Sequence, residues 1–331
     1  MMSLRYLFDN EELARMLVGN WEYDPASLDL FKQYRISANA VYPFRMDGGV
    51  CLLRFSPAAE KSLESLVAEM GFINYLRSRG YPALEPVPTR NGELIVRHDT
   101  PWGLYHASVF RRVPGRELGE VPLEREVLHA YGVALGHLHE LSREYPLPEI
   151  KRWSHTVVLA WIGKILGETS APETAFAELA ILGRFFANLP KGTDNYGLVH
   201  FDFELDNVFY DAATGTCHAI DFDDAMYHWY MMDVVQALDS LENDAGLEGD
   251  ALQTAREAFL AGYRSWSPLD DDSLRQAPAF QRFANLYGYA RVLRAVQEKW
   301  KHEPEWLVGL RARLDEILKQ RSSWFGHPLD N

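Results

Sequence analysis

The chain has 331 residues, of which 47% are hydrophobic and 24% are charged, as expected for a globular protein with room for two domains. Its formal net charge of −14 argues against nucleic acid or an anionic membrane surface as a partner, since both are polyanions. We expect no membrane span and no signal peptide, and the two cysteines, Cys51 and Cys217, lie in apolar runs that favour buried thiols over a disulfide. These features predict a cytoplasmic protein.

The first part of the chain is predicted to form a helix and then a small antiparallel sheet. The helix covers residues 1–24 and ends before Pro25. Asp47-Gly48-Gly49 is typical of a tight hairpin turn with a strand on either side. The outline is of about five strands, and the bounds of four follow from the pattern: residues 40–45, 50–55, 93–97 and 104–113.

The sheet is expected to carry one main helix, between the second and third of these strands. Ser56-Pro57 has the residue types of a helix N-cap followed by the first helical position. Apolar residues then recur at helical spacing until Gly80 ends the helix. Val113-Pro114-Gly115 is typical of a hinge, and helical spacing dominates after it. We therefore divide the chain into residues 1–113 and 114–331.

The segment from His200 to Asp233 interrupts these helices and carries the strongest chemical signal. Asn207 follows Asp202 by five residues, which is the spacing within the kinase catalytic loop H-R-D-x-x-x-x-N. A turn and a short apolar strand lead from there to Asp221. An Asp, an Asn and a second Asp on neighbouring strand-and-loop units are what magnesium-dependent phosphoryl transfer requires. We therefore predict Asp202 as the catalytic base and Asn207 and Asp221 as magnesium ligands; a turn or capping role is the alternative.

Other polar residues of this segment are assigned supporting roles. His200 is expected to hold the loop in shape through hydrogen bonds, and Asp233 to bond back to the loop from the start of a helix. Asp223 and Asp224 could extend the metal or substrate site, or could simply be solvated.

Phosphoryl transfer also needs a cation that grips the phosphates. Arg54 is the best placed, because it lies in an apolar strand where such enzymes usually have a Lys. A solvent-facing Arg on an edge strand is the alternative. Glu69 on the following helix is predicted to position Arg54, with Glu60 and Glu64 as competitors on the same helix.

With these residues assembled, the chain resembles the aminoglycoside phosphotransferase and choline kinase-like family, the small-molecule branch of the protein-kinase-like fold. The resemblance rests on five segments: CLLRF, AEMGFINYLRSRGYP, VALGHLHEL, LVHFDFELDNVF and AIDFDDAMYHWYMMDV. It implies an α+β, bilobal fold, in which residues 1–113 form a small antiparallel-sheet, nucleotide-binding lobe with one main helix. Residues 114–331 would form a larger, mostly helical catalytic and substrate lobe. Two positions depart from the family pattern: Phe201 stands where Gly is usual, and Arg54 where Lys is commoner.

The resemblance also implies a nucleotide site. ATP is the expected nucleotide, with GTP as the alternative, and Mg²⁺ is the expected cofactor. The segment Ser108–Val113, which includes Phe110, would supply backbone hydrogen bonds to adenine. The loop of Ser37 and Asn39 precedes a strand as a phosphate-covering loop would. Because it lacks glycine, an ordinary turn is equally consistent.

We predict a kinase that transfers the γ-phosphate of ATP to a hydroxyl of a small molecule, as a monomer or a homodimer. A Ser/Thr protein kinase is the alternative in the same fold, but only eleven residues separate Asp221 from Asp233, too few for a long activation segment. A non-catalytic, nucleotide-binding scaffold is the alternative of another class, yet it would not need the base and both metal ligands. The acceptor stays open among amino sugars, amino alcohols, amino acids and sugars.

An amine-bearing acceptor is predicted from the acidic residues in and after the catalytic segment. These acids would concentrate a cation if they faced the site: Asp223, Asp224, Asp239, Glu242 and Asp244. Trp229 and Tyr230 could add cation–π contacts to the amine. A solvated acidic face gives the same pattern and is the alternative.

Overall fold

The computed structural model describes residues 2–8, 10–146 and 148–329. The chain forms two compact units. The larger comprises Asp9–Arg152 and Thr193–Asp270, and the smaller comprises Met1–Phe8, Trp153–Gly192 and Asp271–Asn331. Every predicted site residue belongs to the larger unit. This unit contains residues from both predicted lobes, so the two units do not correspond to the lobes, and the lobe boundary after residue 113 remains a proposal.

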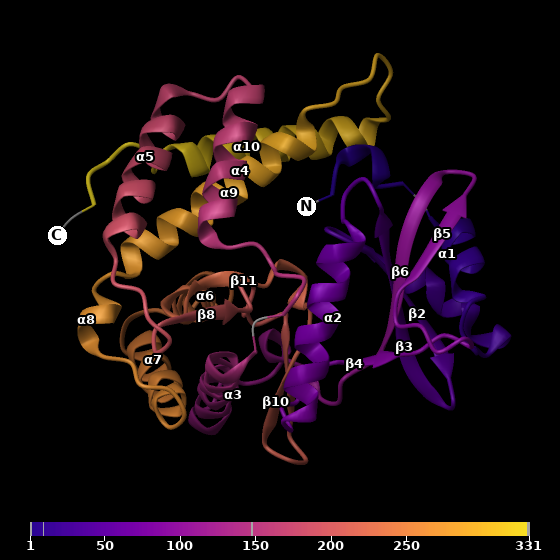
Figure 1. Ribbon diagram of the computed structural model, residues 1–331, viewed down its shortest axis with the longest axis horizontal. Helices are drawn as coiled ribbons and strands as arrows, with labels where there is room; N and C mark the ends of the chain where they lie inside the picture. The colour runs from indigo at the N-terminus through magenta and orange to yellow at the C-terminus, as the bar shows by residue number, and fades with distance from the viewer. Residues whose placement is uncertain (1, 9, 147, 330–331) are drawn as a thin grey trace. The chain divides into compact units, whose positions relative to one another are not determined.

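The larger unit begins with a six-stranded antiparallel sheet of order β1-β2-β3-β6-β4, in which β5 also pairs with β6 (Figure 1). The strands are β1 (Arg35–Ile36), β2 (Ala40–Met46), β3 (Gly49–Pro57), β4 (Glu85–Val87), β5 (Val96–Thr100) and β6 (Gly103–Arg111). Asp47 and Gly48 have φ of 52° and 76°, so the predicted hairpin turn between β2 and β3 is confirmed. The very short strands β1 and β4 were not predicted by residue range.

The two faces of this sheet have different partners because side chains alternate along each strand. On β3, Cys51, Leu53 and Phe55 belong to a buried core. That core also contains residues of helix α1 (Glu11–Val18) and of the 3-10 helix η2 (Pro25–Gln33). Leu52 and Arg54 alternate with these residues and line a pocket on the other face. Helix α2 (Leu63–Ser78) lies on the side of the sheet opposite α1 (Figure 1).

The start of α2 corrects one prediction. Ser56 and Pro57 are not its N-cap and first residue, because they extend β3 and pair with β6 as far as Tyr105. The N-cap is Ser62, whose side chain accepts the backbone N–H of Ser65 at 3.2 Å. The predicted N-terminal helix over residues 1–24 is likewise too long, since it comprises the 3-10 helix η1 (Leu4–Tyr6) and α1.

The rest of the larger unit places the catalytic segment between two long helices and two small sheets. Its elements are β7 (Arg116–Glu117), η3 (Leu118–Glu120), α3 (Arg125–Glu144), β8 (Tyr196–Val199), β9 (Val208–Asp211), β10 (Thr216–Ala219), η4 (Phe222–Asp224), β11 (Met226–Trp229), α6 (Met231–Asn243) and α7 (Gly249–Arg264). The small sheets have the orders β10-β9-β7 and β11-β8. Helices α3 and α7 approach closely at glycines: a Cβ on Gly132 would lie 1.9 Å from the carbonyl oxygen of Phe259.

The smaller unit is helical. It contains η1, α4 (His155–Glu168), α5 (Glu173–Asn188), α8 (Asp271–Leu274), α9 (Ala277–Val296) and α10 (Glu305–Ser322). A buried ion pair joins α5 to α9, in which Arg282 donates to both carboxylate oxygens of Glu178 at 2.7 and 2.5 Å. Arg282 also donates to the carbonyl oxygen of His327 at 2.7 Å, which fixes the segment after α10.

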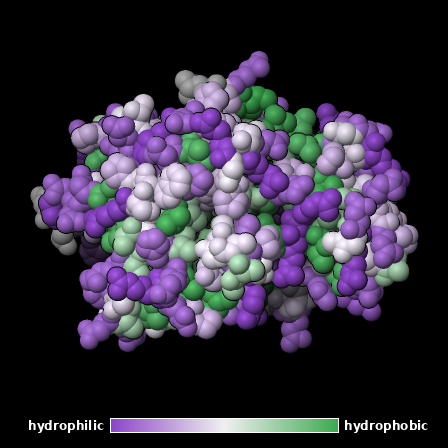
Figure 2. Space-filling model, turned by 90° about the horizontal axis from the view of Figure 1, so that it is seen from below, coloured by the Kyte–Doolittle hydropathy of each residue, from purple (hydrophilic) through white to green (hydrophobic). Residues whose placement is uncertain are grey.

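The predicted fold class is therefore confirmed: the chain is α+β, with an antiparallel sheet in its N-terminal part and a mainly helical C-terminal part. Among the described residues, no helix is long and apolar enough to cross a membrane. Figure 2 shows a face that is mostly hydrophilic, with hydrophobic residues in small, separate groups.

Candidate active site

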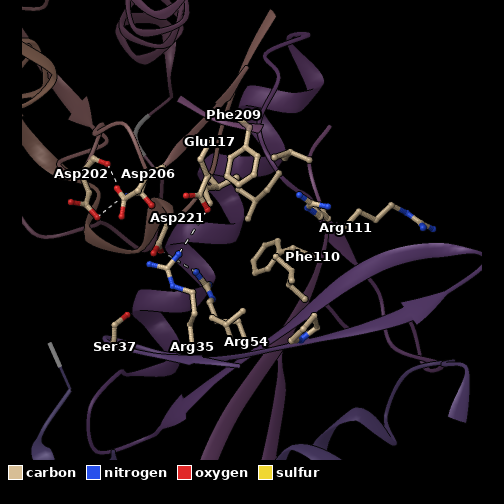
Figure 3. Close-up of a pocket in the computed structure, with 18 of the residues that line it drawn as sticks. Arg35, Ser37, Arg54, Phe110, Arg111, Glu117, Asp202, Asp206, Phe209 and Asp221 are labelled. Atoms are coloured by element: carbon tan, nitrogen blue, oxygen red, sulfur yellow. Dashed lines mark hydrogen bonds and ion pairs between the residues drawn. The ribbon is translucent and has the colours of Figure 1, made fainter. Parts of the chain in front are cut away.

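A pocket of about 490 Å³ opens in the larger unit between the six-stranded sheet and the catalytic segment. The sheet side contributes Leu52, Arg54 and Phe110. Figure 3 shows Asp221 facing Arg35 and Arg54, which rise from the sheet side, while Asp202 lies farther along the catalytic segment. The pocket therefore brings together cationic and anionic groups that lie far apart in the sequence.

Asp202 and Asn207 lie in one loop and are hydrogen-bonded to each other. The side-chain nitrogen of Asn207 donates to Asp202 Oδ2 at 2.8 Å and to the carbonyl oxygen of Asp202 at 3.0 Å. This orients the carboxylate at the wall of the pocket. It also turns the amide so that its oxygen is the atom with which Asn207 could bind a cation.

The loop that carries Asp202 is held from beneath by buried groups. His200 donates through Nε2 to the carbonyl oxygen of Ile220 at 2.8 Å and accepts the backbone N–H of Asp202 through Nδ1 at 3.3 Å. Burial lowers the pKa of His200, which agrees with a neutral ring in this arrangement. The carboxylate of Asp233 accepts the backbone N–H groups of His200 and Phe201, each at 2.7 Å. The predicted structural roles of His200 and Asp233 are confirmed.

Asp221 also lies on the catalytic-segment side of the pocket, in a left-handed conformation with φ of 56° at the start of η4. Its side chain is 42% exposed, but its Oδ1 atom is buried and accepts no hydrogen bond from the described residues. Arg54 Nη1 lies 3.8 Å from this oxygen. Burial, followed by the nearby Asp223 carboxylate, raises the pKa of Asp221. A cation bound at Oδ1 would offset both the burial of the Asp221 carboxylate and its repulsion by Asp223.

A magnesium ion fits this donor set. The buried Oδ1 of Asp221 accepts no hydrogen bond within the described part of the chain, and the amide oxygen of Asn207 is a hard ligand of the kind that Mg²⁺ prefers. Within the described part of the chain, no three His, Cys, Asp or Glu side chains converge on a single metal position. An ion here would therefore take its remaining ligands from water and phosphate oxygens, as is usual for Mg²⁺ in nucleotide sites.

Arg54 and Glu69 form the ion pair that the sequence predicts. Arg54 Nη1 and Nη2 donate to the two carboxylate oxygens of Glu69, both at 2.8 Å. The two residues are only 6% and 1% exposed. Burial alone would lower the pKa of Arg54, but the carboxylate of Glu69, together with those of Asp223 and Asp221, outweighs burial, so the pKa is raised. The guanidinium carbon also lies 4.8 Å from the centroid of the Phe110 ring. The cation is thus fixed at the pocket wall in a single orientation.

Of the other predicted nucleotide contacts, three line the pocket: Ser37, Phe110 and Val113. Asn39 has a different place from the one predicted. It is 5% exposed, and its side-chain nitrogen donates to Asp223 Oδ2 at 3.3 Å rather than pointing to the pocket. The loop of Ser37 and Asn39 therefore supplies one pocket residue and one residue that supports the catalytic segment.

The predicted acceptor contacts Trp229 and Tyr230 are wrong, because both are only 3% exposed. The Trp229 ring packs against Tyr196 at 5.0 Å between centroids, and the Tyr230 ring stacks on His139 at 4.6 Å. Both are core residues with their faces already covered. Asp223 is also covered, by Lys61, whereas Asp224 is half-buried in η4 and its role stays a prediction.

Sequence reasoning missed several residues at the site. Lys61 pairs with Asp223, and Arg152 donates through Nε to the carbonyl oxygen of Ala225 at 2.6 Å. Glu117 lines the pocket, and burial raises its pKa. The role of Lys61 could not be recognised from the sequence, because the predicted helix began at Ser56 and therefore included Lys61, whereas α2 begins after Ser62. Nothing in the sequence distinguishes Arg152 from other basic residues ahead of a helix.

The chain matches the model of the phosphotransferase enzyme family over residues 36–316. The chain belongs to this family. It is 26% identical over 324 residues to the amicoumacin kinase of Bacillus subtilis (strain 168), covering 95% of this chain and 94% of that protein. It is 29% identical over 233 residues to the homoserine kinase of Caulobacter vibrioides (strain NA1000 / CB15N), covering 67% and 68%.

A solved structure shares the fold. An amicoumacin kinase in complex with AMP-PNP and Ca²⁺ superposes with a TM-score of 0.76 at 22% identity, covering 98% of this chain and 96% of that chain. The predicted family and enzyme class, a small-molecule phosphotransferase, are therefore confirmed.

Proposed function

We propose that this phosphotransferase transfers the γ-phosphate of ATP to a hydroxyl of a small, amine-bearing acceptor. The observation that carries the proposal is the convergence of Asp202, Asn207 and Asp221 on one pocket whose other wall holds the paired Arg54 and Glu69. Phosphoryl transfer depends on positioning and charge stabilisation, and this pocket contains the groups for both.

Each residue has a distinct role in this proposal. Asp202 orients the acceptor hydroxyl and takes its proton, because its carboxylate is fixed by Asn207 at the pocket wall. Asn207 and Asp221 hold Mg²⁺, which when bound neutralises charge on the phosphates. Arg54, oriented by Glu69, contacts a phosphate oxygen through the edge of its guanidinium group.

The nucleotide base is proposed to lie against Phe110 and Val113. Both line the pocket where β6 ends, and Leu84 and Ile220 add apolar surface beside them. Backbone groups just beyond a strand can pair with the edge of adenine, and an apolar wall favours stacking of the ring. ATP is the proposed nucleotide, with GTP as the alternative.

Part of the acidic face that favoured an amine on the acceptor is already paired with basic side chains. Among the acids that motivated it, Asp223 is paired with Lys61, and Glu242 is paired with Arg256 at 2.6 Å. The pocket itself still carries an acidic lining: Glu117, Glu120, Asp202, Asp206 and Asp221. The relatives are named for amicoumacin and homoserine, and homoserine carries both an amine and a hydroxyl.

The test is a screen of ATP and GTP consumption over hydroxylated compounds that differ in charge. Homoserine, amicoumacin, amino alcohols and aminoglycosides form the amine-bearing set, in which homoserine is a zwitterion without net charge, and sugars and polyols of similar size form the neutral set. We expect magnesium-dependent transfer to a member of the amine-bearing set, and for an acceptor with a net positive charge this transfer should weaken as ionic strength rises. A neutral acceptor used without salt dependence would contradict the amine, and no acceptor at all would contradict the activity.

A Ser/Thr peptide belongs in the same screen, because a protein kinase is the alternative in this fold. The eleven residues between Asp221 and Asp233 are taken up by η4, β11 and the start of α6. That leaves no length for a segment that could bind a peptide beside the catalytic loop. We expect no transfer to the peptide.

A further inference from the structure

Arg152 joins the first turn of α2 to the turn η4. It lies in the segment between α3 and α4, and its side chain is partly buried. On the α2 side, Nη1 donates to the carbonyl oxygen of Ser65 at 3.0 Å and to Ser65 Oγ at 3.1 Å. On the η4 side, Nε donates to the carbonyl oxygen of Ala225 at 2.6 Å, and Nη2 donates to that of Asp223. All the nitrogens of the guanidinium group therefore hold acceptors, and most of these acceptors are backbone carbonyls.

The two elements joined in this way carry groups from both sides of the candidate site. Ser65 stands one helical turn before Glu69, which orients Arg54. Asp223 follows closely after Asp221, the proposed metal ligand at the start of η4. Arg54 Nη1 lies 3.8 Å from Asp221 Oδ1, which is longer than a hydrogen bond. Direct contact between the phosphate-gripping cation and the metal ligand therefore does not fix their spacing.

The other contacts between these elements are less specific. The Phe222 ring of η4 lies 5.9 Å from the Phe72 ring of α2 between centroids, and such an apolar contact favours burial without a fixed direction. Lys61, just before α2, contacts Asp223 only through the two side chains, which can rotate while the backbones stay in place. The planar fork of Arg152 instead holds backbone atoms of both elements in one geometry.

We propose that Arg152 is a positioning residue that sets the spacing between Arg54 and Asp221, so that both reach the phosphates of one nucleotide. The inference rests on the proposed function, since it takes Arg54 and a metal ion at Asp221 as the phosphate contacts. The role concerns the phosphates and not the base. Among the described residues, Arg152 makes its hydrogen bonds to α2 and η4, whereas the proposed base contact Phe110 lies on β6.

Binding of two ligands tests this, because only one of them has phosphates. AMP-PNP with Mg²⁺ and adenosine are titrated by calorimetry into the wild type, Arg152→Met and Arg152→Lys. We expect the affinity for AMP-PNP with Mg²⁺ to fall about tenfold in both variants, while adenosine binds as it does to the wild type. Arg152→Lys keeps the positive charge but cannot hold both elements, so its loss separates geometry from charge.

Arg79→Met is the matched control. Arg79 stands at the other end of α2, where it pairs with Glu144 of α3, so this variant also removes an arginine that joins α2 to another element. It should bind both ligands as the wild type does. Urea unfolding shows that each variant is folded under the binding conditions, and Arg152→Lys carries the test if Arg152→Met is not.

Two results would overturn the inference. If Arg152 only supported the fold, the affinities for AMP-PNP and adenosine would fall together or not at all. If it acted through its charge, Arg152→Lys would keep the wild-type affinity for AMP-PNP. A wild type that does not bind AMP-PNP overturns the proposed function itself, and the inference with it.

Discussion

The carboxylate of Asp233 accepts the backbone N–H of Phe201 at 2.7 Å, and this hydrogen bond holds Phe201 at a φ of 65°. A left-handed backbone at a non-glycine residue costs about 1–3 kcal/mol. The carbonyl oxygen of Phe201 is also held, by Gln236 at 2.9 Å. The family pattern usually has Gly at this position, and here a buried aromatic residue keeps the same backbone shape. Asp233 thus supports the conformation that presents Asp202 to the pocket.

Asp233→Asn should destabilise the protein and reduce turnover together. An amide has one acceptor oxygen and an NH₂ group, so one of the two N–H groups of His200 and Phe201 would face a donor. We expect a loss of about 3 kcal/mol in the free energy of unfolding, because a buried charged acceptor is removed. Urea unfolding measures the loss. Asp244→Asn, an exposed acid just after the same helix, serves as the control and should change stability little.

At Phe201, substitution by glycine should destabilise the protein less than substitution by alanine, which is the reverse of the usual order. Both Phe201→Ala and Phe201→Gly remove a buried ring and should lose several kcal/mol, about 3–5 for Ala. At φ of 65°, however, Gly avoids the backbone penalty that Ala retains, so Phe201→Gly should be the more stable by about 1 kcal/mol. The same pair of changes at Phe203, which is buried but has no positive φ, should leave Ala the more stable. Equal stabilities of the two Phe201 variants would argue against strain at this site.

Two contacts of the candidate site could be predicted because their constraints are local. Asp202 and Asn207 are five residues apart and so lie in the same loop. Arg54 lies on β3 and Glu69 on α2, the next helix along the chain, so their pairing could be predicted from the order of these two elements. The start of α2 could not be predicted in the same way. Ser56 and Ser62 are both acceptable N-caps, and the choice between them depends on how far β3 pairs with β6, which is a tertiary property.

Burial is the other quantity that the sequence does not contain. Trp229 and Tyr230 follow an acidic turn, which suggests exposure, yet their rings pack on Tyr196 and His139 from other elements. Asn39 shows the same limit, since its partner Asp223 is distant in sequence. Contacts between remote segments decide the role of each of these residues.

Arg54→Lys should weaken nucleotide binding although it keeps the charge. A Lys has one nitrogen and cannot reproduce the two parallel hydrogen bonds to Glu69 at 2.8 Å. We expect AMP-PNP affinity to fall about tenfold, since the cation would no longer be held in one orientation at the pocket wall. Calorimetric titration measures the change. Arg45→Lys, at an exposed position on β2, is the matched control and should bind as the wild type does.

Stability should fall when the pH drops below 6.5, in part because of His139. Its Nε2 donates to Asp233 at 3.0 Å and its Nδ1 accepts from the Tyr263 hydroxyl at 2.8 Å. Burial lowers its pKa from the usual 6.5, so the folded state keeps the ring neutral while the unfolded chain takes up a proton. This contribution is complete above pH 6.5 and is lost as the pH falls below it, by up to about 1.4 kcal/mol per pH unit.

Urea unfolding at about pH 7.5 and about pH 5.5 measures this slope. His139→Gln removes the titrating ring and should be less stable at both pH values but with a shallower dependence. Burial also lowers the pKa of His200, so part of the slope should persist in that variant. An unchanged slope in His139→Gln would assign the pH dependence to other groups.

Asp202→Asn should separate catalysis from nucleotide binding. The carboxylate of Asp202 is proposed to act on the acceptor hydroxyl, so its loss should reduce turnover about 100-fold or more. The variant keeps an oxygen that can accept from Asn207, which bonds to Oδ2 at 2.8 Å, so the loop should hold its shape. AMP-PNP affinity should stay within about twofold of the wild type, because Asp202 does not contact the phosphates in this proposal.

Asp221→Ala is the contrasting variant, and the two must be measured side by side. It removes the carboxylate whose Oδ1 accepts no hydrogen bond from the residues that the structure describes, so the gain in AMP-PNP affinity on adding Mg²⁺ should disappear. Titrations with and without Mg²⁺, alongside single-turnover rates, distinguish the two roles. Near wild-type turnover in Asp202→Asn would remove it as the base. An intact magnesium effect in Asp221→Ala would place the ion on other ligands.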